Sequence, residues 1–474
     1  MSNYLFTLTI TPVQSFISQA RKTKDLFAGS EILSNLVKET LKQFDTKEII
    51  FPQNSDFTSN KFVLVLKRTE EEIRKLGEKL EEFIHNEFYN LGADILLNRE
   101  DTTVDLDLFQ NHFKPQLCNF FQVFLVAVEL KEDDYKKSYR KLEQNLGAVK
   151  NLRTFEQLAQ ISGRKCSVCG ERNGLFYNRE KPHAFMLDKA IKINTNQIEE
   201  QESLCAVCFT KRFYPNSQHF DSTQEIKNDK GYYALIHFDI DNMGEELSKL
   251  NKDEQIALSQ KLGAFAYKAR EIVSKKNTIY TGGDDFLGFV ELDKLFDTIS
   301  KITDIFKETI PNMTFSTSII ICHWKTPLHK VLDYSRELLA TTKNHFDNKN
   351  GVGIIVMSSS AINAQTICKY HELTLLDKMR EKEIGMGLHY KLQTIFSYLD
   401  SMSYDEYLMQ KQMIKTEIKR LLKRENGELN ESLYNKLIAF LGNQKIKHAT
   451  NCYEIDFDNF IGYLKTLEQL KKVM

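Results

Sequence analysis

Proline, long apolar runs and net charge are all scarce in this 474-residue sequence, and each shortage excludes a class of protein. With only 7 prolines, 42% hydrophobic residues and no low-complexity segment, the composition is typical of a folded globular protein, not a disordered or fibrous one. A formal net charge of −1 creates no global basic field, so any nucleic-acid binding would depend on local patches or partner subunits. The length predicts roughly two to four domains.

The sequence also lacks a membrane-spanning segment and an export signal. Its longest apolar stretch, residues 120–130, is shorter than the ~20 apolar residues of a spanning helix, and the N-terminus has no basic and hydrophobic leader. We therefore expect a cytoplasmic protein with no membrane partner. Its eight cysteines should stay reduced and serve as metal ligands or core residues.

Three catalytic motifs are missing. There is no G-x-x-x-x-G-K-[ST] loop for P-loop ATP hydrolysis and no G-x-S-x-G elbow for an α/β-hydrolase. None of the eleven histidines is followed by Asp, so a His-Asp doublet that could hold a nuclease metal is missing too. His237 lies within an apolar run and is expected to be a satisfied core histidine.

Two stretches of the chain follow one β-α-β-β-α-β plan, that of the ferredoxin-like unit. The first includes a helical region over 14–44 interrupted at Gly29-Ser30, and the second includes a helix over 245–275. The repetition predicts an α/β (α+β) architecture of two related domains. The expected divisions are a first ferredoxin-like domain at 1–130, a helical linker with a cysteine-rich segment at 131–222, a second ferredoxin-like domain at 223–361 and a C-terminal helical domain at 362–474.

The segment Gly282-Gly283-Asp284-Asp285 lies between two strand-like runs. Glycine can take the positive φ that a tight hairpin needs, so an ordinary turn is an equally good interpretation of this segment by itself. Adjacent carboxylates repel each other unless a cation offsets them, and a bound divalent ion would do so.

A second pair of acids, Asp239 and Asp241, ends the apolar strand 234–240. Ligands bind at this end of strands in open α/β sheets, and the spacing of two predicts that both acids share one face. A strand-end Asp beside a hairpin-tip Asp is the carboxylate pair that two-metal nucleotidyl transfer requires. Such oxygen ligands favour Mg²⁺ or Mn²⁺.

Three further residues are candidates for phosphate binding. Asn242 opens the next helix, whose free backbone N–H groups could hold phosphates. Lys343 and Lys349 are plausible triphosphate contacts, although a lone surface lysine is more often simply solvated.

Two CxxC pairs, Cys166/Cys169 and Cys205/Cys208, can close a tetrahedral Cys₄ zinc site. Closed sites of this kind are structural, so we expect zinc to stabilise a small subdomain. The isolated cysteines are expected to be ordinary core or surface residues: Cys118, Cys322, Cys368 and Cys452.

Taken together, these motifs resemble the large palm-domain subunit of type III CRISPR effector complexes, Cmr type. The resemblance covers the chain from its first strand to about Met357 and is specific, because independent segments occur in the family's order. The matching segments are Thr11 to Ile17, Gln19 to Ser30, Asn151 to Phe155, Phe238 to Gly244, Gly282 to Asp285 and Cys322 to Leu328.

The resemblance implies two palm domains, the second of the GGDEF or polymerase type, with a zinc segment between them and a helical C-terminal domain. It implies an antiviral complex in which pairing of guide RNA with target RNA activates conversion of ATP into cyclic oligoadenylate messengers. The implied partners are other Cmr-type subunits, guide RNA and target RNA. The implied metal ligands are Asp239 and Asp284, assisted by Asp285.

The resemblance also implies a set of nucleotide-binding residues. Gly282 and Gly283 would let the backbone approach the nucleotide, and residues of the first palm would face a second nucleotide. The full set is Ser15, Arg21, Asp25, Ile240, Asn242, Gly282, Gly283, Lys343 and Lys349.

Longer family members begin with an HD-nuclease domain, whereas this sequence begins directly at the first palm strand, which predicts no single-stranded DNA cleavage. Some members without that domain are thought to join ATP to S-adenosylmethionine, and the sequence leaves both products open. A scaffold that only binds guide RNA and partner subunits is the main alternative. A diguanylate-cyclase-like enzyme would explain the hairpin but neither the Cys₄ segment nor the first palm.

Overall fold

The computed structural model divides by its contacts into two compact units, Met1–Ser222 with Asn242–Phe286, and Thr223–Asp241 with Leu287–Met474. The four-domain division expected from the sequence stays a prediction. The structure describes residues 2–100, 104–131, 134–152, 163–178, 191–193, 195–359, 361–380, 387–399, 402–426, 431–447 and 453–474.

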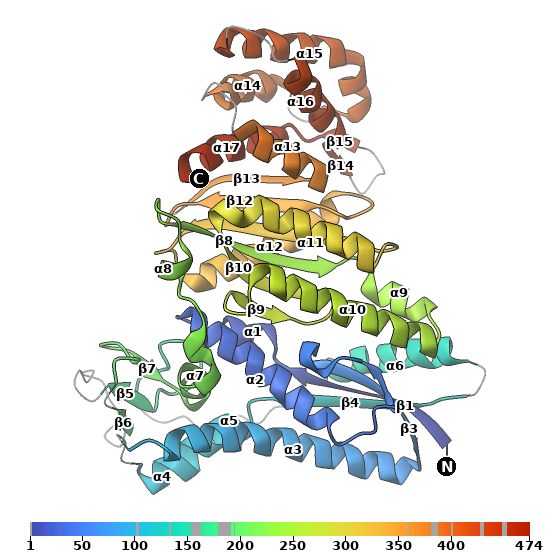
Figure 1. The fold of residues 1–474 in the computed structure, drawn as a ribbon, viewed down its shortest axis with the longest axis vertical. Helices are drawn as coiled ribbons and strands as arrows, with labels where there is room; N and C mark the ends of the chain where they lie inside the picture. Colours follow the sequence, from blue (N-terminus) through green and yellow to red (C-terminus); the bar gives the residue numbers. More distant parts are fainter. Residues whose placement is uncertain are drawn as a thin grey trace. The chain divides into compact units, whose positions relative to one another are not determined.

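The first unit contains a four-stranded antiparallel sheet in the order β2-β3-β1-β4 (Figure 1). Leu5 at the centre of β1 lies opposite Val65 of β3 and Val128 of β4. This order confirms the ferredoxin-like plan predicted from the sequence. The strands are β1 (Ser2–Thr11), β2 (Ile49–Phe51), β3 (Lys61–Arg68) and β4 (Gln122–Glu129).

Helix α6 covers one face of this sheet. Tyr139 and Leu142 of α6 pack with Leu5, Val63 and Phe124 in one buried cluster. Helix α3 begins at a capping box, in which Thr69 accepts a hydrogen bond from the Glu72 N–H and donates its own N–H to the Glu72 carboxylate. The helices here are α1 (Gln14–Ser18), α2 (Thr23–Leu41), α3 (Glu70–Leu97), α4 (Leu106–Leu108), α5 (Lys114–Cys118) and α6 (Tyr135–Lys150).

The predicted interruption of the N-terminal helical region at Gly29-Ser30 is wrong, because both residues lie inside α2. The break falls at residues 19–22 instead. There the Asp25 carboxylate accepts the backbone N–H groups of Arg21 and Lys22 at 3.2 Å, which starts a new helix at Thr23. A side-chain cap therefore sets the break, not a glycine.

A second sheet has six strands in the order β13-β12-β11-β8-β10-β9 (Figure 1). Strand β8 pairs antiparallel with β11, where Ile236 lies opposite Ile319, and β11 pairs parallel with β12. Helix α12 (Leu328–His345) packs against β8, β11 and β12. The strands are β8 (Tyr232–Ile240), β9 (Thr278–Thr281), β10 (Asp285–Glu291), β11 (Phe315–His323), β12 (Val352–Met357) and β13 (Ile362–Cys368).

The single helix expected over 245–275 is two helices, α9 (Met243–Lys249) and α10 (Lys252–Val273). Asn251 accepts the Glu254 N–H at 2.9 Å, and Glu254 accepts the Asn251 N–H at 2.7 Å. This reciprocal cap begins a new helix and so ends the preceding one.

The C-terminal region is not helical from its start, since residues 362–368 form β13 antiparallel to β12. Helix α17 packs closely on this edge strand, where a Cβ on Gly462 would lie 2.1 Å from the Gln365 carbonyl oxygen. Figure 1 shows α13 to α17 gathered beyond β13. Their bounds are α13 (Tyr370–Arg380), α14 (Leu388–Phe396), α15 (Tyr404–Asn426), α16 (Glu431–Asn443) and α17 (Phe457–Val473).

No helix among the described residues combines the length and apolar character that crossing a bilayer requires. The remaining elements are β5 (Phe176–Asn178), β6 (Ile191–Ile193), β7 (Ser203–Leu204), α7 (Ala206–Arg212), α8 (Thr223–Ile226), α11 (Leu295–Thr309), α12 (Leu328–His345), β14 (Lys445–Lys447) and β15 (Tyr453–Ile455), with 3₁₀ turns at 55–57, 215–219, 292–294 and 397–399 and a π-helical turn at 109–113.

Candidate active site and metal centre

The hairpin between β9 and β10 has a three-residue loop, Gly282 to Asp284. Gly283 has a φ of +87°, a conformation that side chains rarely allow. The Gly282 N–H donates to the Asp285 carbonyl at 2.9 Å, and a Cβ on Gly282 would lie 2.4 Å from Asp285 Oδ1. The predicted hairpin is confirmed, and the positive φ of Gly283 is the part of its geometry that favours glycine.

Phe51 of β2, Ser59 and Tyr139 of α6 lie near this hairpin within the first unit. A Cβ on Gly283 would lie 3.8 Å from the Phe51 ring, and one on Gly282 would lie 3.9 Å from Ser59 Cβ. Burial raises the pKa of Tyr139, and the charges of Glu143 and Asp284 raise it further. Sequence reasoning missed these neighbours because no motif marks them.

Asp239 occupies the penultimate position of β8 and keeps 36% of its side chain exposed. Its carboxylate forms an ion pair with Lys343 of α12, whose side chain is 23% exposed. A candidate acid and a candidate triphosphate contact thus lie together in the second unit. Asp284 and Asp285 belong to the first unit, so one site built from all three acids remains a prediction.

Asp241 has a different environment from Asp239. Strand β8 ends at Ile240, so the predicted shared face does not extend to Asp241. Its buried carboxylate accepts hydrogen bonds from Thr314 Oγ1 at 2.8 Å, Ser316 Oγ at 2.9 Å and the Asn350 N–H at 3.0 Å. With three donors on two oxygens, Asp241 is a structural acid that fixes the strand end.

His237, Ile240 and Asn242 lie in β8 or just after it. His237 is buried with Nδ1 3.0 Å from Ser335 Oγ, and burial, aided by the charges of Arg336 and Lys343, lowers its pKa to about 4. It is a neutral core histidine, as predicted. Ile240 is buried, and Asn242 is exposed with a left-handed φ of 57°.

The candidates in the N-terminal motif separate into exposed and buried residues. Ser15 is exposed, and Arg21 is 53% exposed with Nη1 3.8 Å from Glu202 Oε1. Asp25 is buried and receives both Arg212 Nε at 2.7 Å and Arg212 Nη2 at 2.9 Å. Arg212 and the Arg21 and Lys22 N–H groups thus occupy the Asp25 carboxylate, and a nucleotide contact of Asp25 stays a prediction.

The four predicted zinc ligands converge, with their sulfur atoms all within 4.8 Å of one another. Cys169 Sγ and Cys205 Sγ are 3.8 Å apart, which is about the separation that tetrahedral Zn–S bonds of ~2.3 Å produce. The Gly170 N–H donates to the Cys166 carbonyl at 2.9 Å, and Gly170 has a φ of +69°. The arrangement fits a closed structural zinc site.

Helix α7 links this cysteine cluster to the N-terminal motif. Cys205 caps the helix, and the consecutive residues Lys211 and Arg212 end it. Lys211 Nζ donates to the backbone carbonyls of Phe16, Ile17 and Gln19, and Arg212 also pairs with Glu202. The ends of α1 and α2 are thus held by two buried cations from the cysteine segment.

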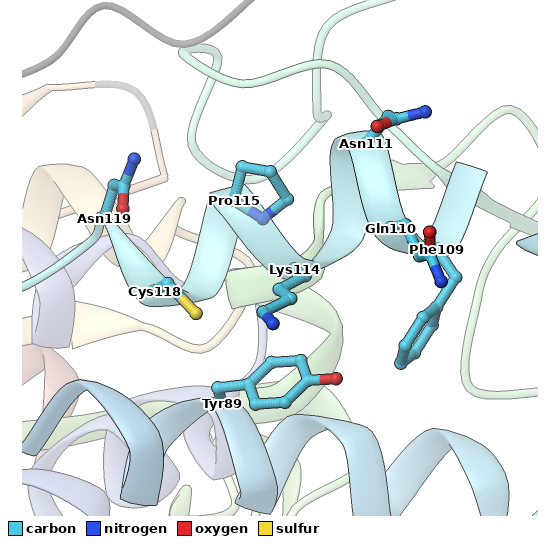
Figure 2. A pocket seen from close by; sticks show the side chains of 8 residues that line it. All are labelled: Tyr89, Phe109, Gln110, Asn111, Lys114, Pro115, Cys118 and Asn119. Carbon is cyan, nitrogen blue, oxygen red and sulfur yellow. The ribbon is translucent and has the colours of Figure 1, made fainter. Parts of the chain in front are cut away.

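A separate groove of about 670 Å³ lies between α3 and the π-helical turn with α5 (Figure 2). Lys114 Nζ lies 5.3 Å from the Tyr89 ring centroid there, and Cys118 lines the groove. No predicted site residue lines it.

The isolated cysteines Cys322 and Cys368 are buried, as expected of core residues. Cys452 and residues 153–155 of the matching segment Asn151 to Phe155 lie outside the described residues.

Comparisons with known proteins identify relatives of both halves of the chain. The family model for the second palm domain of Cas10/Cmr2 matches residues 232–353, and that for the N-terminal region of the CRISPR-associated protein Cmr2 matches residues 5–93. The Cmr2 subunit of the CRISPR Cmr system of Pyrococcus furiosus is 22% identical over an alignment that is 657 positions long, gaps included. The alignment covers 95% of this chain and 73% of the relative.

Solved structures share the fold. A type III-B Cmr-beta complex bound to cognate target RNA matches 99% of this chain and 83% of its own at a TM-score of 0.71 and 14% identity. A Csm1–Csm4 cassette in complex with one ATP matches 100% of this chain and 70% of its own at a TM-score of 0.55 and 13% identity. The two family models and the Cmr2 relative thus make the chain similar to Cas10/Cmr2 large subunits of type III-B CRISPR systems, and the solved structures show that it shares their fold.

Proposed function

We propose that this chain is the catalytic large subunit of a type III CRISPR effector complex and converts ATP into a cyclic oligoadenylate-type messenger when target RNA is bound. The hairpin carries this proposal: a tight turn with Gly283 at a positive φ is followed by two adjacent acids, Asp284 in the loop and Asp285 at the start of β10. A subunit that served only as a scaffold has no need to hold like charges together.

Asp239, Asp284 and Asp285 would hold the catalytic metals. Strands β8 and β10, which carry Asp239 and Asp285, are neighbours in the strand order of the second sheet. This donor set of carboxylate oxygens suits Mg²⁺ or Mn²⁺.

Bound metals would lower the pKa of the attacking hydroxyl and would offset the negative charge of the triphosphate. The chain itself contributes positioning. Lys343 balances Asp239 in the absence of a metal, and we expect it to turn to the triphosphate when an ion takes its place. Lys349, Asn242 and the backbone of Ile240 complete the expected nucleotide contacts, and Ser15 and Arg21 remain candidates for a second nucleotide.

Relatives support adenine nucleotides as substrates and an assembled complex as the active form. Csm1–Csm4 cassettes of the same fold have been solved with ATP, AMPPNP and cA4, and a Cmr-beta complex has been solved with cognate target RNA. We therefore propose other Cmr-type subunits, guide RNA and target RNA as partners. A linear adduct of ATP with S-adenosylmethionine stays an alternative product of the same site.

The test is a reconstituted complex with guide RNA, matching target RNA and Mn²⁺, in which labelled ATP is followed by chromatography with and without S-adenosylmethionine. We expect new product that depends on target RNA, and a loss of at least about 100-fold in Asp284→Asn/Asp285→Asn. Asp304→Asn, at an exposed position on α11, is the matched control and should behave as wild type.

The S-adenosylmethionine arm distinguishes the products, because only the adduct requires this co-substrate. Consumption of ATP that does not depend on the hairpin acids would contradict the proposed site. A complex that binds RNA but consumes no ATP under any of these conditions would be a scaffold.

A further inference from the structure

The loop after α12, residues 346–351, adopts an uncommon backbone conformation. Lys349 and Asn350 have φ values of 50° and 53°, in the left-handed region that residues other than glycine seldom enter. The Asn350 N–H donates to Asp241 at 3.0 Å, and the Gly351 carbonyl accepts the Thr317 N–H at 2.9 Å. One side of the loop is therefore fixed to the ends of β8 and β11.

A single ammonium group fixes the other side of the loop. Lys369 Nζ donates to Asn348 Oδ1 at 2.7 Å and to the Lys349 carbonyl, and it lies 4.0 Å from the Phe346 ring centroid. Three of the six loop residues thus contact one side chain. That side chain comes from the first residue after β13, outside the segment that matches the second palm model.

Lys369 is itself held by the C-terminal region. Its backbone N–H donates to Glu372 Oε2 at 2.7 Å, and Asn443 of α16 donates to the other carboxylate oxygen of Glu372 at 3.3 Å. Burial lowers the pKa of Lys369, whereas the carboxylates of Glu372 and Asp241 raise it. The ammonium therefore lies in a partly buried position between the palm loop and the helices that follow it.

We propose that Lys369 is a positioning residue for the nucleotide: it fixes the loop that carries Lys349 beside the Asp241 end of β8. This inference rests on the proposed function, in which Lys349 contacts the triphosphate. Because the loop is fixed from two sides, the backbone at Lys349 is held in place before the substrate arrives. Substrate binding therefore does not have to order the loop. Lys369 acts through the loop and makes no contact with the reacting atoms.

The test compares Lys369→Met and Lys369→Arg in the assembled complex, with Lys378→Met on the exposed face of α13 as the matched control. We expect Lys369→Met to raise the KM for ATP about tenfold with kcat changed less than about twofold. Lys369→Arg keeps the cation and should stay near wild type. Asn348→Ala, at an exposed loop position, removes one acceptor and should raise KM about threefold even if Lys369→Met fails to fold.

Hydrogen exchange at the Asn350 and Gly351 amides is an independent readout, since it needs no activity. Faster exchange in Lys369→Met than in Lys378→Met supports the fixing of the loop, whether or not the wild-type complex consumes ATP. Unchanged exchange overturns the inference. Faster exchange with an unchanged KM, in a complex that does make product, overturns the assignment to nucleotide positioning while leaving the proposed function intact.

Discussion

Two acid–cation pairs in this chain have the same chemistry and opposite surroundings. Asp25 and Arg212 form a bidentate pair with side chains 3% and 0% exposed, and Glu202 joins them. Asp239 and Lys343 form a pair that is 36% and 23% exposed. The buried pair has exhausted the hydrogen-bonding capacity of its acid, whereas the half-exposed pair can be opened by a competing cation at little cost.

The comparison separates acids that build the fold from acids available to substrate. An acid-rich motif by itself does not distinguish the two roles, since Asp25 and Asp239 both lie in segments that match the family. Burial and the number of donors do distinguish them. The same criterion separates Asp239 from its neighbour Asp241, whose carboxylate receives three hydrogen bonds.

The largest effect on stability is expected at the cysteine cluster, because helix α7 connects this cluster to the buried Asp25–Arg212 pair. Cys205→Ser/Cys208→Ser should abolish zinc binding, whose apparent free energy is about 10 kcal/mol or more in small zinc domains, and should loosen α7 with its buried cations Lys211 and Arg212. Metal content by mass spectrometry and hydrogen exchange over 206–212 measure this. Cys118→Ser is the control, and full exchange protection without zinc would contradict a structural role for the metal.

The next effect concerns the buried pair. Arg212→Met removes the buried cation that pairs with both Asp25 and Glu202, so we expect a loss of about 3–5 kcal/mol in the free energy of unfolding. Denaturant titration measures it. Arg21→Met, whose guanidinium is half exposed, should cost less than about 1 kcal/mol; equal effects of the two substitutions would show that burial does not distinguish these charges.

A smaller effect is expected from His237 as pH falls. Its folded pKa of about 4 lies below its unfolded value of 6.5, so the unfolded state binds the proton first. Stability is therefore complete above pH 6.5, declines as pH falls, and stops declining below about pH 4. The loss at pH 5 is about 2 kcal/mol. His237→Gln should flatten the dependence of the unfolding midpoint between pH 7 and 5, and the exposed His329→Gln should not.

The smallest effect on stability is expected at the half-exposed pair. Asp239→Asn should change the free energy of unfolding by less than about 1 kcal/mol, because solvent already screens the charges. The same substitution should remove product formation. A change above about 3 kcal/mol, measured by the same denaturant titration, would place Asp239 with the structural acids.

Most elements and the cysteine cluster could be predicted from the sequence because their signals are local. Alternating apolar residues, the Gly282-Gly283 turn and the CxxC spacings each determine their own structure within a few residues. The break before α2 could not be found in this way, since it depends on how the Asp25 carboxylate is used. The arginine that buries this carboxylate is 187 positions away.

The strand conformation of β13 and the contacts of Lys369 were not predicted from the sequence, for related reasons. Strand β13 exposes several side chains, and its strand conformation depends on pairing with β12 and on close packing of Gly462. Lys369 belongs to no motif, and its role depends on a loop some twenty residues earlier in the chain. Long-range packing decides both.

The most direct test of the account is Mn²⁺ binding, followed by electron paramagnetic resonance in the assembled complex with a non-hydrolysable ATP analogue. We predict that Asp239→Asn and Asp284→Asn/Asp285→Asn each weaken Mn²⁺ binding by at least about tenfold, while Asp304→Asn leaves it unchanged. Equal Mn²⁺ affinity in wild type and all three variants would contradict the assignment of these acids to the metals.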